Sequence, residues 1–358
     1  MITARSDIGG GPKHVYDLVR TMKTSSAVEV FIAAPMSGEF ANKFSEIADS
    51  HMEIPFRKFS IACFFSLLRY ARQNQIDVIH SHGRGAGIYS RLLGCFGFKI
   101  VHTFHGAHYK ENFIGMIKSL VDKILKYQTD QFICVSKDEK QKIIEYNWAW
   151  EKKINVILNG IDHDNINKKY NSLKSQNSSL VFGTLARFDY QKGIDIFLEV
   201  VKANKEYFIS ENIIFKIAGD GEEFVKLDSR KKAYGLDGLV EFMGVTSAPV
   251  EFLATLDVYF SFARWEGLPL AVLEAMSCPL PCILSDVVGH NELNFGGECL
   301  LFDLKTQGDF VEKVKRLLQV SDRSIMANKS FAMISKMYTL KKMTENTINV
   351  YKKMTHPG

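Results

Sequence analysis

Short apolar runs rich in β-branched residues alternate with longer segments of helical period along the whole chain. This alternation is typical of α/β folds, in which helices cover both faces of a parallel sheet. The strands that we expect fall into two series. The first series comprises residues 28–34, 77–82, 99–104, 131–136 and 154–159. The second comprises residues 179–186, 213–219, 239–244, 257–262 and 281–286.

A polar stretch without hydrophobic period, residues 163–179, separates the two series. At 358 residues the chain is long enough for two domains. We therefore expect two Rossmann-like domains with a cleft that faces the carboxyl ends of both sheets. The predicted divisions are an N-terminal domain over residues 1–165, a linker over 166–179, a C-terminal domain over 180–338, and a last helical segment over 339–358 that packs back on the N-terminal domain.

The composition is that of a soluble globular protein, with 46% hydrophobic and 24% charged residues. No apolar run approaches the roughly 18 residues of a membrane span and no secretory signal pattern is present, so we expect a cytoplasmic protein. The six cysteines lie in apolar surroundings without histidine partners at zinc spacing, and the one close pair, Cys278 and Cys282, is expected to be two buried thiols. Residues 1–170 hold 23 Lys and Arg against 17 Asp and Glu. This excess is too small for a nucleic-acid reader, but it favours an anionic surface, a membrane included.

Three successive glycines open the first helical segment, in SDIGGGPKHVYDLV. At Gly10 and Gly11 the backbone can approach a ligand closely, and Pro12 suits the first position of a helix whose free N–H groups would face an anion. The spacing is not GxGxxG, so a tight strand-to-helix turn explains the motif equally well. Only ITARSD, residues 2–7, is available for a strand before the Gly-rich turn, which is short for a central strand and favours a start that lies upstream.

The stretch GTLARFDYQKG, residues 183–193, ends the first strand of the second series. Arg187 and Lys192 leave that strand at the carboxyl end of the sheet, where two cations would stabilise a phosphate or a departing diphosphate. Solvated surface charges are the ordinary alternative for such a pair. The location at a strand end favours the phosphate interpretation.

Two glutamates, Glu266 and Glu274, flank the apolar run WEGLPLAVLEAM. Glycosidase carboxylates lie about 5 to 9.5 Å apart, whereas eight residues of helix would separate these two by roughly 12 Å. We therefore expect them to hold two ends of one extended ligand. The backbone N–H groups from Gly267 to Leu270, with Pro269 in the first turn of a helix, offer an anion site between them.

With these motifs in place, the chain resembles the retaining family 4 glycosyltransferases, which have the GT-B fold and an E-x7-E motif. Residues 266–276 reproduce the common form EGLPxxxLEAM of that motif. The other shared motifs follow in the family's order over nearly the whole chain, and they are the GGxxxH start, the strand-end His82, HG at 105–106, NGID at 159–162, RFDxxKG, GDG at 219–221 and FxG at 242–244.

The resemblance implies an acceptor domain at the N-terminus and a nucleotide-sugar donor domain at the C-terminus. It implies that Glu266 holds hydroxyls of the donor sugar, that Arg187 and Lys192 hold the diphosphate, and that His105 lies beside the donor sugar and the acceptor. Glu274 would bind the ribose, and the nucleobase would stack near Val245. The implied donor-binding residues are Gly10, Gly11, Thr184, Arg187, Lys192, Gly219, Val245, Gly267, Leu268, Pro269, Leu270 and Glu274.

The implied activity is that of a hexosyltransferase-type retaining enzyme that takes a sugar from a nucleotide sugar to a glycan or lipid-linked acceptor, in surface polysaccharide biosynthesis. In such enzymes the acceptor attacks the face from which the diphosphate leaves, and no metal or other cofactor is expected. Ordinary core or rim positions are expected for His14, His80, His82 and His102. The alternatives are a GT-B nucleotide-sugar epimerase and a non-catalytic GT-B subunit or scaffold.

Two segments have an apolar stripe with basic residues beside it, FIGMIKSLVDKILKYQ at 113–128 and RKFSIACFFSLLRYAR at 57–72. Each is explained either by an ordinary helix that faces the core or by a helix that lies on an anionic bilayer. The second explanation would suit an enzyme on the inner face of the cytoplasmic membrane.

Overall fold

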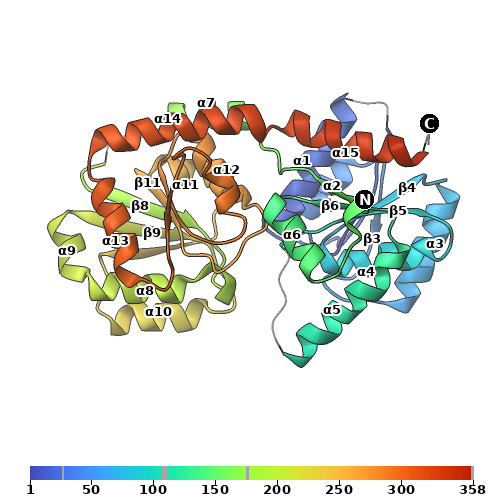
Figure 1. Cartoon of the computed structure of the whole chain (residues 1–358), viewed down its shortest axis with the longest axis horizontal. Coiled ribbons are helices and arrows are strands. Elements are labelled where there is room, and N and C mark those ends of the chain that lie inside the picture. Colours follow the sequence, from blue (N-terminus) through green and yellow to red (C-terminus); the bar gives the residue numbers. More distant parts are fainter. Residues whose placement is uncertain (26–27, 107–111, 175–176, 356–358) are drawn as a thin grey trace. The chain divides into compact units, whose positions relative to one another are not determined.

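The structure is a computed structural model that describes residues 1–25, 28–106, 112–174 and 177–355. Its contacts divide the chain into two compact units, which Figure 1 shows coloured along the sequence. The N-terminal unit consists of Met1–Gly160 and Leu340–Gly358, and the C-terminal unit of Ile161–Thr339. Within the described residues, no helix is both long and apolar enough to cross a membrane.

The N-terminal unit contains a seven-stranded parallel sheet in the order β3-β2-β1-β4-β5-β6-β7. Its strands are β1 (Ile2–Thr3), β2 (Phe31–Ala34), β3 (Ser50–Glu53), β4 (Val78–His82), β5 (Lys99–Thr103), β6 (Gln131–Cys134) and β7 (Ile154–Val156). Its helices are α1 (Gly10–Ser25), α2 (Glu39–Ile47), α3 (Ile61–Gln73), α4 (Gly83–Gly94), α5 (Phe113–Leu125), α6 (Lys137–Glu145) and α15 (Leu340–Thr355), with short 3-10 turns η1 (Lys126–Gln128) and η2 (Glu151–Lys153). The strand order reverses between β1 and β4, which is where such sheets bind ligands.

The C-terminal unit contains a six-stranded parallel sheet in the order β10-β9-β8-β11-β12-β13. Its strands are β8 (Leu180–Leu185), β9 (Ile213–Ala218), β10 (Val240–Gly244), β11 (Val258–Ser261), β12 (Cys282–Ser285) and β13 (Leu300–Phe302). Its helices are α7 (His163–Leu173), α8 (Ile194–Ala203), α9 (Lys205–Ser210), α10 (Phe224–Ala233), α11 (Pro249–Ala254), α12 (Leu270–Ser277), α13 (Gln307–Arg316) and α14 (Val320–Met337), with 3-10 turns η3 (Tyr190–Lys192) and η4 (Asn291–Leu293). Phenylalanines dominate the core of this unit.

The predicted α/β architecture with two parallel sheets is confirmed, and each of the ten predicted runs contains a strand. The edge strands β3 and β13 were not predicted. The first is the half-exposed SHME, which lacks an apolar alternation, and the second has only three residues. The last helix, α15, packs on α1 in the N-terminal unit, as expected.

The predicted linker is where the structure differs most from the sequence prediction. Residues 163–173 form α7, which packs on α11 and α12 inside the C-terminal unit. Ile166 and Tyr170, four positions apart, are buried and dock this otherwise polar helix. The chain passes between the units at Gly160 and Ile161, and again at Thr339 and Leu340, rather than at the predicted boundaries. Two anchoring residues were too few to produce a visible hydrophobic period.

Candidate active site

The loop after β8 carries Arg187 and Lys192 at the carboxyl edge of the C-terminal sheet. Asp189 begins the turn η3 and accepts a hydrogen bond from the Lys192 backbone N–H at 3.2 Å. Gly193 follows with φ +66°, and a Cβ there would lie 2.1 Å from the carbonyl oxygen of Phe262. The loop therefore requires glycine at this position in order to pack against the chain that leaves β11.

Lys192 and Glu266 form an ion pair across this edge of the sheet. The distance from Lys192 Nζ to Glu266 Oε1 is 2.5 Å, and the side chains are 17% and 9% exposed. Gln191 Nε2 donates to the carbonyl oxygen of Trp265 at 2.9 Å and reaches Glu266 Oε2 at 3.4 Å. The first glutamate of the sequence motif is thus directly coupled to the cationic loop after β8.

Arg264 holds the same loop in place, although the sequence did not point to it. Its guanidinium makes two hydrogen bonds to Asp195 on α8, at 2.9 and 2.7 Å, and lies 3.9 Å from the centre of the Tyr190 ring. Its backbone N–H donates to the Gln191 carbonyl at 2.7 Å. Arg187 is more exposed than these groups, at 42%, and pairs with Asp189 at 2.9 Å. Arg187 is therefore the more exposed of the two cations, although its guanidinium is held by Asp189.

The helix predicted to contain both glutamates begins only at Leu270, because Pro269 is its N-cap residue. Glu266, Gly267 and Leu268 are not helical. The assumption of eight helical residues, from which the separation of roughly 12 Å was estimated, is therefore wrong. Glu274 does lie on the helix and is 7% exposed. The apolar run that follows Pro269 is helical from Leu270 onward, whereas the residues that precede the proline form a loop.

A second loop covers Glu266 and Gly267 from the side of β12. The Glu266 backbone N–H donates to the Val288 carbonyl at 3.1 Å. Gly289 has φ +88°, and a Cβ there would lie 2.6 Å from the carbonyl oxygen of Gly267. His290 follows, buried, with Nδ1 hydrogen-bonded to Ser285. Burial lowers the pKa of His290, and the nearby Glu266 carboxylate partly opposes this.

The remaining predicted donor residues follow neighbouring strands of this sheet. Val245 follows β10 and is 55% exposed, and Gly219 follows β9 with its α-carbon against the Ala186 backbone. Because β10, β9, β8 and β11 are adjacent and parallel, these residues share the edge that carries Arg187. Thr184 is different, since it is 2% exposed inside β8, with its hydroxyl directed at Tyr259.

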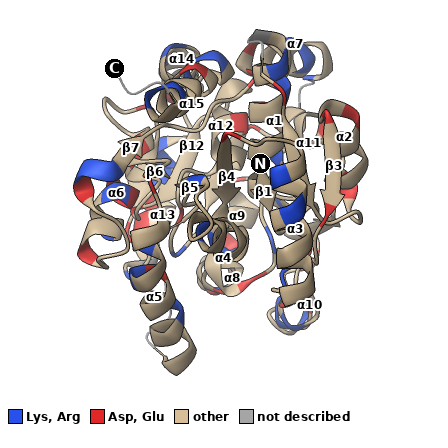
Figure 2. Ribbon diagram, turned by 90° about the vertical axis from the view of Figure 1, so that its right-hand side faces the viewer, with Lys and Arg blue, Asp and Glu red and all other residues tan. Residues whose placement is uncertain are grey.

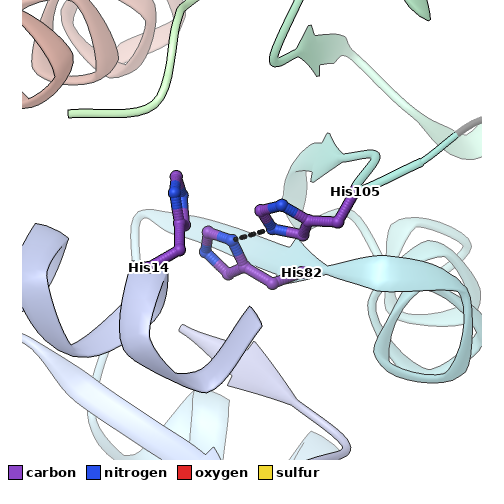
Figure 3. Close-up of side chains that lie close together, drawn as sticks. All are labelled: His14, His82 and His105. Atoms are coloured by element: carbon purple, nitrogen blue, oxygen red, sulfur yellow. Dashed lines mark hydrogen bonds between the residues drawn. The ribbon is translucent and has the colours of Figure 1, made fainter. Parts of the chain in front are cut away.

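In the N-terminal unit, α1 begins at Gly10, so that Gly10 and Gly11 form its first turn and Pro12 is its third residue. One turn further, His14 meets His82 from the end of β4 and His105 from the segment after β5 (Figure 3). His82 Nδ1 and His105 Nε2 lie 3.3 Å apart, and the ring centres of His14 and His105 lie 4.7 Å apart. The three imidazoles form one cluster beside the N-terminus of α1.

Burial lowers the pKa of His14 to about 4, and it lowers the pKa values of His82 and His105 well below the usual range. The cluster is therefore neutral near pH 7. Neutral imidazoles are also the ligands that zinc prefers, and the donor atoms of these three lie within 4.8 Å of one another. The hydrogen bond between His82 and His105, however, occupies two of those nitrogens. Residues 107–111, which follow His105, lie outside the described residues.

The other two predicted core histidines are buried in the core, although His102 Nε2 has no hydrogen-bond partner among the described residues. Both ring nitrogens of His80 have partners, Tyr351 at 2.5 Å and Thr103 at 2.6 Å. His102 is buried, with Nδ1 hydrogen-bonded to Ser81 at 2.9 Å. His14 and His82, by contrast, belong to the His105 cluster, which the sequence did not indicate.

Glu139, at the start of α6, holds the turn that carries His105. Its carboxylate accepts hydrogen bonds from the backbone N–H groups of Gly106 at 2.6 Å and Val135 at 2.8 Å. The Glu139 N–H in turn donates to Ser136 Oγ at 3.0 Å. Burial raises the pKa of Glu139 to about 7. This residue was missed from the sequence, although S-x-x-E before a helical segment is the signature of a capping box.

Comparison with known sequences gives matches over most of the chain. Residues 8–165 match the family described as Glycosyltransferase Family 4, and residues 165–331 match Glycosyl transferases group 1. Over 309 residues the chain is 28% identical to an Escherichia coli UDP-Gal:alpha-D-GlcNAc-diphosphoundecaprenol alpha-1,3-galactosyltransferase, covering 80% of this chain and 78% of the relative. Over 321 residues it is 26% identical to the Escherichia coli O-antigen biosynthesis glycosyltransferase WbnH, covering 88% of each chain.

Solved structures show the same fold at low sequence identity. Anabaena HepE in complex with UDP and glucose superposes with a TM-score of 0.84 at 16% identity, covering 97% of each chain. Sucrose-phosphate synthase from Thermosynechococcus elongatus has a TM-score of 0.84 at 16% identity, covering 100% of this chain and 98% of the other. At such identities the likeness establishes the arrangement of strands and helices.

Proposed function

This chain belongs to the family 4 glycosyltransferases and has the GT-B fold, and on that premise we propose that it transfers a hexose from a nucleotide sugar to a lipid-linked glycan acceptor, with retention of anomeric configuration. The pathway is surface polysaccharide biosynthesis. Relatives with names from O-antigen and capsule synthesis support this assignment, and one relative is named for a diphosphoundecaprenol-linked acceptor.

The observation that carries the proposal is the Lys192–Glu266 pair beside Arg187 at the carboxyl edge of the second sheet. In this proposal Arg187 and Lys192 bind the diphosphate of the donor. Glu266, already held by Lys192 and Gln191, accepts hydrogen bonds from hydroxyls of the donor sugar. Two cations next to one buried carboxylate match a ligand that carries both a diphosphate and a sugar.

The remaining donor contacts complete this site. Glu274 binds the ribose and the backbone near Val245 faces the nucleobase. The backbone N–H groups of Gly267 and Leu268 add hydrogen bonds to the phosphates. These contacts hold the donor in one orientation, which lowers the entropic cost of reaching the transition state.

In the reaction, an acceptor hydroxyl attacks the anomeric carbon from the face that the diphosphate leaves. The new C–O bond forms as the bond to the diphosphate oxygen breaks, and the departing phosphate oxygen takes the hydroxyl proton. His105 serves as a neutral hydrogen-bonding group for the acceptor, consistent with its lowered pKa. Arg187 and Lys192 balance the charge that develops on the diphosphate. The proposal requires no metal ion.

We also place the enzyme on the inner face of the cytoplasmic membrane, where a lipid-linked acceptor would be presented. The basic excess of residues 1–170, with 23 Lys and Arg against 17 Asp and Glu, supports attraction to an anionic surface.

A thermal-shift screen against a panel of nucleotide sugars tests the proposal. A ligand at 100 times its dissociation constant adds about 2.7 kcal/mol to the free energy of unfolding, which is easily seen as a higher melting temperature. The donor identified in this way is then incubated with a lipid-linked glycan, and proton NMR of the product gives the anomeric configuration. An inverted product would refute retention, and no stabilisation by any nucleotide sugar would refute the donor site.

A further inference from the structure

Helix α5, Phe113–Leu125, exposes its apolar side chains instead of burying them. Large hydrophobic residues on α5 and the following turn are between 46% and 76% exposed, and they are Phe113, Ile114, Met116, Ile117, Leu120, Ile124 and Tyr127. In both Figure 1 and Figure 2 the helix projects beyond the rest of the N-terminal unit, with its N-terminal end outermost. Such a continuous exposed apolar stripe is unusual, because isolated surface hydrophobics are the norm.

The buried side of α5 carries two polar side chains, Ser119 and Asp122, beside the apolar Leu125. Asp122 is 1% exposed and accepts hydrogen bonds from Arg91 at 2.7 Å and Arg84 at 2.8 Å. Ser119 accepts a hydrogen bond from the indole N–H of Trp148 at 2.9 Å. These contacts fix the rotation of the helix, because turning the apolar side inward would break both ion pairs of Asp122. The usual arrangement of a surface helix, apolar side inward, is thus reversed.

The charges on α5 indicate what covers the apolar stripe. Its exposed charged residues are Lys118 and Lys123, and its one acid, Asp122, is buried. Tyr127, 66% exposed, ends the stripe and contacts Trp150, which is 37% exposed. Apolar side chains bordered by lysines and by aromatic residues with a polar edge are typical of helices at a membrane surface.

We propose that α5 is the membrane-docking element of this protein and lies in the headgroup region of an anionic bilayer, with its stripe toward the acyl chains. At 1.5 Å per residue the helix is about 20 Å long, which suits a position in the plane of the interface rather than across the bilayer. The second apolar segment, α3 (Ile61–Gln73), differs, because Phe64, Leu67, Leu68 and Ala71 face the core and only Ile61 and Phe65 among its large apolar residues are more than half exposed.

The position of α5 in the chain connects it to the reaction. Phe113 follows His105 by eight residues, which span at most about 29 Å when fully extended. A bilayer that covers α5 would therefore lie within that reach of His105, where a lipid-linked acceptor must arrive. This consequence rests on the proposed transferase function, whereas the docking itself does not.

Vesicle flotation of the full chain tests the docking. The protein is mixed with vesicles of phosphatidylcholine and phosphatidylglycerol, or of phosphatidylcholine alone. We expect the wild type to bind the anionic vesicles. The double variant Ile117→Glu, Leu120→Glu should bind them with an affinity lower by roughly a hundredfold or more, because each aliphatic side chain buried in the bilayer contributes roughly a tenfold factor or more to the affinity. The matched control is Val225→Glu on α10, where a valine is 76% exposed outside the stripe and binding should be unchanged.

The charge contribution is measured with the double variant Lys118→Gln, Lys123→Gln. Each lysine near an anionic surface contributes roughly a fivefold factor to the affinity. We therefore expect the affinity to fall about twenty-five-fold on anionic vesicles and not at all on phosphatidylcholine. Insertion is followed with Leu120→Trp, whose fluorescence should shift to the blue on anionic vesicles, whereas that of Val225→Trp should not. Unchanged melting temperatures of the glutamate variants show that they fold.

Three results would overturn the proposal. The first is a wild-type protein that does not float with anionic vesicles, and the second is a stripe variant that floats as well as the wild type. The third concerns light scattering: the wild type is a dimer, the double variant Ile117→Glu, Leu120→Glu is a monomer, and both bind vesicles equally well. The stripe would then be an interface between two copies of the chain. None of these experiments uses sugar transfer, so failure of docking is distinguishable from failure of the proposed activity.

Discussion

Replacing Lys192 by alanine removes the cation from a carboxylate that has almost no access to water. Glu266 is 8% exposed, and after the substitution its remaining side-chain contact is Gln191 at 3.4 Å. Breaking a fully buried ion pair costs about 3 to 5 kcal/mol, and an exposed one costs less than about 1 kcal/mol. Because Lys192 is 17% exposed, we expect Lys192→Ala to lower the free energy of unfolding by about 2 to 3 kcal/mol.

The measurement is thermal and urea unfolding of Lys192→Ala, Glu266→Gln and the double variant. For a unit of this size the expected loss corresponds to a melting temperature lower by about 5 to 10 °C. The double variant should be more stable than Lys192→Ala alone, because it also removes the unpaired carboxylate. The two single variants should each reduce turnover by orders of magnitude, since both groups face the donor in the proposed site.

A matched comparison is Arg187→Ala, which removes a cation from the same loop. Its guanidinium is 42% exposed, so the substitution should change the free energy of unfolding by less than about 1 kcal/mol while still reducing turnover strongly. If Lys192→Ala unfolded at the wild-type temperature, the Lys192–Glu266 ion pair would not stabilise the folded state. Near-normal turnover in both lysine and arginine variants would refute the diphosphate assignment.

The remaining predictions concern metal, pH and one glycine. A chelator should leave sugar transfer unchanged, and a reversible loss would show that the metal-free mechanism is wrong. Burial lowers the pKa of His14 from 6.5 to about 4, so the unfolded chain takes up a proton at this residue before the folded chain does. The free energy of unfolding should therefore fall as the pH drops from 6.5 to 4, by up to about 1.4 kcal/mol per pH unit. Urea titrations of the wild type and of His14→Phe at several pH values compare this dependence. Burial raises the pKa of Glu139 from 4.5 to about 7, so its contribution to stability should fall as the pH rises through that range, and Glu139→Gln should abolish this part of the profile. Gly289→Ala places a Cβ 2.6 Å from the Gly267 carbonyl oxygen at a positive φ, and it should lower both the melting temperature and the turnover. The control is Gly238→Ala, which is also at positive φ but has no atom within 4 Å of the added Cβ, and it should lower the melting temperature less.

Alternation of apolar runs and helical segments was sufficient to predict the two parallel sheets. It also placed Arg187, Gly219, Val245 and Glu266 after successive strands, and parallel strands bring such positions to one edge. This information is local, because each strand is recognised from its own residues and the direction of the sheet follows from the connecting helices. The edge strands β3 and β13 lack that local signal and were missed.

Pairings between distant residues were decided only by the tertiary structure. Arg264 reaches Asp195 and Lys192 reaches Glu266 across dozens of positions, and no spacing rule in the sequence connects them. The same is true of Glu139, which holds the backbone of Gly106. Partners of this kind depend on which loops the fold brings to the same end of the sheet.

Helix α5 shows most clearly which features follow from the sequence and which depend on the tertiary structure. The sequence by itself determined that the segment has one apolar stripe and one polar side, since the 3.6-residue period settles which residues share a face. It could not determine which face is buried. That choice was made by Arg84, Arg91 and Trp148, which offer polar partners to Asp122 and Ser119 and so turn the apolar stripe outward.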